Sequence, residues 1–284
     1  MTAAARPELL AREGVLEPAA FMSYGLIPLS VGMFPHLFQH WLTARSSESF
    51  KAPVVLHPLL ILLVWLPCVL MGVWASGALS LPPEKANAVL GVLVARFTEP
   101  WMSGIVTAGI LAAIMSSLDS QFVCLGTIFT HDVVVHLTGD KFDEAQRVQL
   151  GRIFIVAIVA VTYLLSLAPP PNVFDLAVWC FSGFASLFPL VVAAVYWRRA
   201  TAAGAIACVL VAGGTWAALF YDGLLAPTLA GERIGEDYLI WGMMPVTVMI
   251  AASTTALVVV SLLTRPPSSA TVGRFFDEAG TSAA

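Results

Sequence analysis

Residues 100–130 read PWMSGIVTAGILAAIMSSLDSQFVCLGTIFT, and this stretch decides the class of fold. It has 31 positions and a single charged residue, Asp119. A helix of this length extends about 46 Å at 1.5 Å per residue, whereas the hydrocarbon core of a bilayer is about 30 Å thick. The stretch therefore predicts a membrane-spanning helix that tilts or extends beyond the hydrocarbon core.

Six other apolar stretches are long enough to span a bilayer. Together with the first, the seven predicted spans cover residues 18–42, 54–77, 100–130, 152–169, 173–197, 203–222 and 239–263. The chain is 58% hydrophobic and 11% charged with a mean hydropathy of +0.86, which excludes a soluble domain and a disordered chain. We predict an all-α, polytopic membrane bundle of about seven spans.

The domain organisation follows from the same pattern. We expect a polar N-terminal tail over 1–17, a transmembrane domain over 18–264 and a polar C-terminal tail over 265–284. The long connection 78–99 contains apolar residues, which favours a short amphipathic helix there.

Composition also excludes classes of function. The chain has 14 Lys and Arg against 18 Asp and Glu, so no basic surplus is available for nucleic acid. Five histidines without an adjacent pair do not form the ligand set of a membrane di-iron enzyme, although His36 and His40 are four residues apart. We find no nucleophile and base at catalytic spacing and expect no enzymatic activity.

The orientation follows from positive charge, because cytoplasmic loops retain Lys and Arg. One set of alternate loops carries 5 Lys and Arg, and the other set, which includes the C-terminal tail, carries 9. We therefore predict a multi-pass protein of the cell membrane with its N-terminus outside and its C-terminus in the cytoplasm.

Small residues recur every four positions along 100–130. Gly104, Ala108, Ala112, Ser116 and Ser120 form one row, and Gly109, Ala113 and Ser117 form its neighbour. Close packing against another helix explains such a stripe. The alternative is that hydroxyls and a backbone carbonyl on this face bind a hard cation such as Na⁺.

Asp119 is the only carboxylate in the interior of a predicted span, since Asp175 and Asp222 lie at the ends of theirs. An ionisable side chain there is costly unless it faces a cavity or a partner, which favours a functional role, and a structural hydrogen bond is the alternative. At about 100° per residue, Asp119 lies about 60° and Ser120 about 40° from Ser116 around the helix. All three can border one polar pocket.

The first predicted span contains Gly25, Pro28, Gly32 and Pro35 within eleven residues. So many helix breakers predict a broken or kinked segment. Discontinuous spans expose backbone groups to the substrate or ion in secondary transporters, whereas a kinked packing helix is the alternative.

Three stretches resemble the sodium:solute symporter family, which includes proline, pantothenate and sodium/glucose carriers. They are Ala112–Gln121 followed by Thr127–Asp132, Gly32–His36 leading to Ala44, and Tyr196–Ala205. The resemblance extends over about 20–265. It implies a fold of two inverted five-helix repeats, of which this chain has the second repeat and two peripheral helices.

The resemblance also implies a set of site residues. Na⁺ would be bound by the carbonyl of Ala113 and the hydroxyls of Ser116 and Ser117. A possible second cation would use Asp119 and Ser120, where a carboxylate stands in place of one family hydroxyl; a proton or a plain hydrogen bond is also possible. The substrate side of the broken helix would be Gly32, Met33, Phe34 and Pro35.

From these expectations we predict the C-terminal portion of a sodium-driven symporter. Its cofactor is the sodium ion, and its partners are the lipid bilayer, a small solute and the missing N-terminal half or a partner chain. The alternative is a non-transporting membrane scaffold or a sensor input module derived from a symporter. The sequence does not identify the solute.

Overall fold

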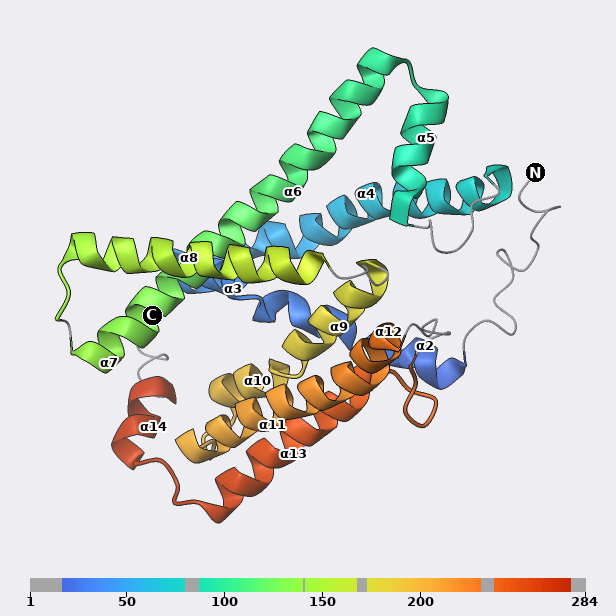
Figure 1. The fold of residues 1–284 in the computed structure, drawn as a ribbon. Helices are drawn as coiled ribbons and strands as arrows, with labels where there is room; N and C mark the ends of the chain where they lie inside the picture. The colour runs from blue at the N-terminus through green and yellow to red at the C-terminus, as the bar shows by residue number, and fades with distance from the viewer. Residues whose placement is uncertain (1–16, 80–86, 140, 168–172, 231–237, 277–284) are drawn as a thin grey trace. The chain divides into compact units, whose positions relative to one another are not determined.

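The computed structural model describes residues 17–79, 87–139, 141–167, 173–230 and 238–276. These residues form helices and, apart from an isolated bridge between Ile240 and Met243, no β-structure. The predicted tail over 1–17, apart from Glu17, and the three prolines at 169–171 lie outside the described residues. The chain divides into two compact units, drawn with their helix labels in Figure 1.

Unit 1 includes the described residues 35–167. Its elements are α3 (Pro35–Leu42), η3 (Ser47–Phe50), α4 (Lys51–Ala78), α5 (Val89–Phe97), α6 (Pro100–Ile128), the π-helix η5 (Phe129–Val135), α7 (His136–Thr138) and α8 (Glu144–Ser166). The short helix expected within 78–99 is present as α5, which contacts both α4 and α6.

Unit 2 includes the described residues 17–34 and 173–276. Its elements are α2 (Pro18–Tyr24), the 3₁₀-helix η2 (Ile27–Met33), α9 (Val173–Ala185), α10 (Phe188–Tyr196), α11 (Ala202–Phe220), the π-helix η6 (Tyr221–Leu225), α12 (Ala226–Leu229), α13 (Pro245–Leu263) and α14 (Ser269–Phe276). Helix α14 lies within the stretch that the sequence predicted only as a polar tail.

Six helical segments in the described residues are long and apolar enough to cross a membrane, and the bent pair 18–33 and 35–42 makes a seventh if it is one span. This confirms the predicted class, an all-α polytopic bundle of about seven spans. Some predicted ends are wrong. Helix α8 begins at Glu144 rather than 152, because Asp143 and Gln146 form a capping box that starts the helix in polar sequence.

Helix α13 also begins later than predicted, at Pro245 rather than 239. A tight turn precedes it, in which Trp241 and Gly242 have φ of 53° and 75°. The hydroxyl of Ser23 on α2 accepts a 3.0 Å hydrogen bond from Met244 N and holds the turn against α2. Hydropathy could not locate this start, because the residues of the turn are as apolar as those of the helix.

The core of unit 2 lies around α13. Helices α11 and α13 pack side by side (Figure 1), and the closest approach is at Gly204, where an added Cβ would overlap Ser261 Oγ. Further along, Trp179, Leu224 and Met249 form a buried apolar cluster. Close packing of small residues and apolar burial together define this unit.

The predicted span 173–197 is confirmed as one segment long enough to cross a membrane, Val173–Tyr196, and within it a short break separates α9 from α10, which the sequence analysis missed. Pro189 lacks the N–H that would continue the helical hydrogen bonds, and Ser186 and Leu187 form the break. The Ser186 carbonyl accepts a 2.8 Å hydrogen bond from the hydroxyl of Ser253 on α13. Both serines are fully buried, so this bond satisfies a carbonyl that water cannot reach.

In unit 1, α6 and α8 cross closely. Gly126 and Gly151 meet there, and a Cβ added to Gly126 would lie 2.8 Å from Ile155 Cδ1. Phe129 and Phe154 stack beside the crossing, with ring centroids 4.0 Å apart.

Candidate functional site

The candidate sodium ligands all lie on α6. This helix is regular from Pro100 to Ile128, so Ala113, Ser116 and Ser117 have fixed positions around one axis. Ser120 lies on the same face one turn further along, whereas Asp119 lies about 60° from Ser116 on the side away from Ser117. A rigid helix suits a binding site because its side chains keep their relative geometry.

The candidate residues on α6 are exposed. The Ser120 hydroxyl donates a 3.2 Å hydrogen bond to the carbonyl of Ser116 within its own helix. Within the part of the chain that the structure describes, the Asp119 carboxylate and the Ser116 and Ser117 hydroxyls have no hydrogen bond or ion pair. Three polar side chains on one spanning helix thus keep their capacity to bind.

Within unit 1, close packing against another helix does not explain the glycines of the small-residue stripe on α6. A Cβ added to Gly104 or Gly109 meets no described atom within 4 Å. The close helix crossing is instead at Gly126, outside the predicted rows. At Gly104 and Gly109, the packing interpretation of the stripe therefore has no support among the described residues.

The polar face of α6 continues into a cavity of about 530 Å³ between α6, η5 and α8. Val123 and Thr127 lie about 20° on either side of Ser116 around the helix and line this cavity. Its other polar lining residues are Thr130, His131, Asp143, Glu144, Arg147 and Arg152. The mixed-charge cavity thus lies on the same side of α6 as Ser116, about two to three turns further along the helix.

The broken helix is present where the breakers predicted it. Phe34 has an extended backbone with ψ of 126°, and the helical pieces on either side of it are bent by 61°. Gly32 and Met33 are buried and Pro35 is half-buried. Phe34 packs against Phe181 and Phe184 of α9, with centroid distances of 5.5 and 4.5 Å, so its ring is engaged in unit 2.

Helix α3, the second piece of the broken segment, contacts α6 within unit 1. The structure therefore brings Pro35 and its helix to the helix that carries the candidate ligands. Gly32, Met33 and Phe34 belong to unit 2.

One polar group at the break was missed from the sequence. Ser30 in η2 is 1% exposed, and its hydroxyl has no hydrogen-bond partner among the described residues. A buried hydroxyl without a partner is costly, which makes it a candidate for function. Its position between Pro28 and Gly32 was the only available signal.

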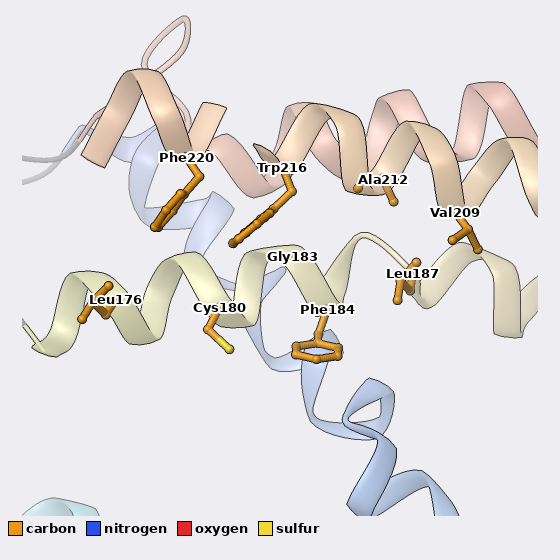
Figure 2. Close-up of a pocket in the computed structure, with 10 residues that line it drawn as sticks. Leu176, Cys180, Gly183, Phe184, Leu187, Val209, Ala212, Trp216 and Phe220 are labelled. Carbon is orange, nitrogen blue, oxygen red and sulfur yellow. The ribbon is translucent and has the colours of Figure 1, made fainter. Parts of the chain in front are cut away.

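A second cavity, of about 520 Å³, lies between α9 and α11. Figure 2 shows Leu176, Cys180 and Phe184 of α9 across from Val209, Trp216 and Phe220 of α11. The Trp216 indole N–H donates a 2.9 Å hydrogen bond to the Trp179 carbonyl and is not available to a ligand. This apolar groove offers no partner for the charged groups of a zwitterionic solute.

Comparison with known proteins identifies the relationship. The profile of the sodium:solute symporter family matches residues 6–212. The chain belongs to the sodium:solute symporter family. This confirms the resemblance found in the sequence motifs, and the apolar spans make this family member a multi-pass membrane protein.

Several characterised transporters are similar to this family member. The chain is 27% identical over 261 residues to the sodium/proline symporter of Haemophilus influenzae, which covers 86% of this chain and 49% of that protein. It is 30% identical over 178 residues to the osmoregulated proline transporter OpuE of Bacillus subtilis, covering 62% and 34%. It is 25% identical over 216 residues to the sodium/pantothenate symporter of H. influenzae, covering 68% and 45%. The chain thus spans about half or less of the length of these relatives.

Proposed function

We propose that the chain is part of a sodium-driven symporter that moves a small solute across the cell membrane. The observation that carries this proposal is the set of exposed polar side chains in the middle of α6, where Ser116, Ser117 and Asp119 have no protein partner among the described residues. Membership of the sodium:solute symporter family supports Na⁺ as the ion. Inward movement of Na⁺ releases about 2.3 kcal/mol per 100 mV of membrane potential, which can drive uptake.

In this proposal, Na⁺ is held by the carbonyl of Ala113 and the hydroxyls of Ser116 and Ser117. Asp119 and Ser120 hold a second cation or a proton. The broken segment over 32–35 borders the solute, because unwound backbone supplies carbonyl and N–H groups near the middle of the membrane. In this proposal, the cavity beside Thr127 gives the bound ion access to water.

We further propose that the site is completed by helices other than those described. Hard cations such as Ca²⁺ take about six to eight oxygen ligands, and α6 offers three to Na⁺. The remaining oxygens would come from an N-terminal half or a partner chain, with the N-terminus of this chain outside and its C-terminus in the cytoplasm. Proline and pantothenate are the first solutes to test, because similar proteins are named for them.

The first experiment is uptake into liposomes under an inward Na⁺ gradient, with this chain alone and with the five-helix N-terminal half of a family member added. We expect saturable, Na⁺-stimulated uptake only with both parts. Uptake by the chain alone would contradict the need for other helices. A well-inserted pair of chains without uptake of any solute in a broad panel would favour a scaffold or a sensor module instead.

The second experiment tests the ligands. Ser116→Ala and Ser117→Ala should each raise the Na⁺ concentration needed for half-maximal uptake at least tenfold, because each removes an oxygen ligand. Thr107→Ala is the matched control, since Thr107 is exposed on α6 about 180° from Ser116. Unchanged Na⁺ activation in both serine variants would exclude this site.

Asp119→Asn tests the second cation separately. If Asp119 binds a cation or proton, the number of charges moved per solute or the pH profile of uptake changes. An unchanged stoichiometry and an unchanged pH profile would leave Asp119 with a structural role.

A further inference from the structure

Charge is segregated along unit 2. All the arginines that the structure describes in this unit lie at one end, in the α10–α11 turn and after α13; they are Arg198, Arg199, Arg265 and Arg274. The described carboxylates of the unit, Glu17, Asp175 and Asp222, lie at the other end, beside the starts of α2 and α9 and the end of α11. We call the four arginines and the helix α14 the basic end.

Contacts hold the basic end together. The Arg199 guanidinium donates hydrogen bonds of 3.3 and 2.8 Å to the carbonyls of Leu262 and Thr264, which terminate α13. Arg198 lies over the ring of Phe276, with its guanidinium carbon 5.4 Å from the centroid. The α10–α11 turn is thereby joined to the end of α13 and to α14, as their positions in Figure 1 show.

The connection to α13 keeps α14 near the membrane boundary. Only residues 264–268 separate the end of α13 from α14, and five residues reach at most about 18 Å. The Ser268 hydroxyl accepts a 3.1 Å hydrogen bond from Thr271 N and caps the new helix. With α13 spanning the hydrocarbon, as its length and composition allow, α14 would begin within about 18 Å of the hydrocarbon boundary.

Two arginines at this end have no polar partner among the described residues. Arg265 and Arg274 are exposed and make no ion pair or hydrogen bond within the described ranges. Next to Arg274, the Phe275 side chain is 72% exposed, while Phe276 is turned toward Arg198. An exposed aromatic ring beside a basic group is typical of helices that lie in a membrane interface.

We propose that the basic end binds the phosphates of anionic phospholipids, with α14 lying in the interface and Phe275 inserted at the boundary of the acyl chains. Guanidinium groups bind phosphate oxygens in a bidentate manner, which suits Arg265 and Arg274. The remaining two arginines have other tasks, since Arg199 caps α13 and Arg198 positions α14 through Phe276. This proposal depends on the spanning helices and not on transport.

Hydrogen exchange of the full chain in lipid nanodiscs tests the proposal. Amides of residues 269–276 should exchange at least tenfold more slowly in discs containing phosphatidylglycerol than in discs of phosphatidylcholine alone. Each arginine adds roughly fivefold, equivalent to about 1 kcal/mol per basic residue at an anionic surface. The double variant Arg265→Gln, Arg274→Gln should therefore lose most of the difference between the two lipids.

Two controls distinguish headgroup binding from changes in folding. Arg265→Lys with Arg274→Lys keeps the charges and should keep most of the protection. Arg96 is an exposed arginine outside the basic end, and its guanidinium carbon lies 5.8 Å from the ring centroid of Phe97. Arg96→Gln should therefore leave the protection of α14 unchanged.

Three results would overturn the proposal. The first is equal exchange of α14 in both lipids. The second is equal protection by inorganic phosphate in phosphatidylcholine discs, which would make the site one for free phosphate. The third concerns Asp277 and Glu278, which follow α14 in the sequence and lie outside the described residues. Asp277→Asn with Glu278→Gln should strengthen the lipid effect, and a loss of protection in this variant would contradict an interaction with anionic lipid.

Discussion

At the scale of single residues, Gly204 controls the approach of α11 to α13. An added Cβ would overlap Ser261 Oγ and lie 2.9 Å from the Leu257 carbonyl oxygen, which is backbone and cannot turn away. We expect Gly204→Ala to lower the free energy of unfolding by about 1–3 kcal/mol, the usual cost of overpacking. Gly214→Ala on the same helix is the control, because its Cβ would meet no described atom within 4 Å.

Thermal unfolding of the full chain in one detergent measures both variants. A Gly204→Ala protein as stable as the Gly214→Ala protein would show that α11 and α13 are not packed at this distance. The thiol of Cys208, buried in the same helix, gives a second measure, since looser packing should increase its labelling rate.

Residues differ in how far the sequence could predict them. The clustering of Asp119, Ser116 and Ser120 within about 100° around one helix follows from helical periodicity alone, because α6 is regular through this stretch. The oxygen atoms opposite that face cannot be predicted in this way. Ser30 was missed because its burial depends on packing against α9, which comes from a distant part of the chain.

At the scale of elements, the break between α9 and α10 depends on α13. The Ser253 hydroxyl supplies the donor for the buried Ser186 carbonyl. Ser253→Ala should lower the free energy of unfolding by about 1–3 kcal/mol, because it leaves that carbonyl without a partner. Thr255→Ala on the same helix should have little effect, since Thr255 is exposed and bonds only to the Ala251 carbonyl of its own helix.

Thermal unfolding again measures the difference, and exchange of the Leu187 and Phe188 amides shows whether the break has loosened. Equal stability of the Ser253→Ala and Thr255→Ala proteins would mean that the Ser186 carbonyl finds another donor.

The two helix breaks differ in how well the local sequence predicts them. Four breakers within eleven residues predicted the break at Phe34 correctly, because no helix can accommodate them all. Pro189 alone did not reveal the second break, since a single proline often only kinks a spanning helix. Whether Pro189 breaks the segment or only kinks it depends on Ser253, which lies in another helix, α13.

At the scale of the whole molecule, the orientation in the membrane remains a prediction from charge. The arginines at one end of unit 2 are among the charges on which that prediction is based. In a cysteine-free background, an impermeant thiol reagent added outside should label a cysteine at Arg96 and spare one at Lys141, both of which are exposed. After permeabilisation both should react. Labelling of position 141 from outside in sealed cells would reverse the orientation and the assignment of helices.

The turn before α13 should make the stability of this chain depend on whether lipid or water surrounds that turn. Trp241 has a left-handed backbone conformation, which costs a residue with a Cβ roughly 1–2 kcal/mol, and it is 84% exposed, the largest value among the large apolar side chains described. An interfacial lipid layer offsets that cost by accepting the indole ring, whereas bulk water does not. Trp241→Gly should therefore stabilise the protein where no lipid meets the turn and destabilise it where lipid does. The effect of Trp241→Gly on the free energy of unfolding would therefore have opposite signs in a micelle and in a bilayer. The residue at this turn suits the protein in its lipid rather than the protein alone.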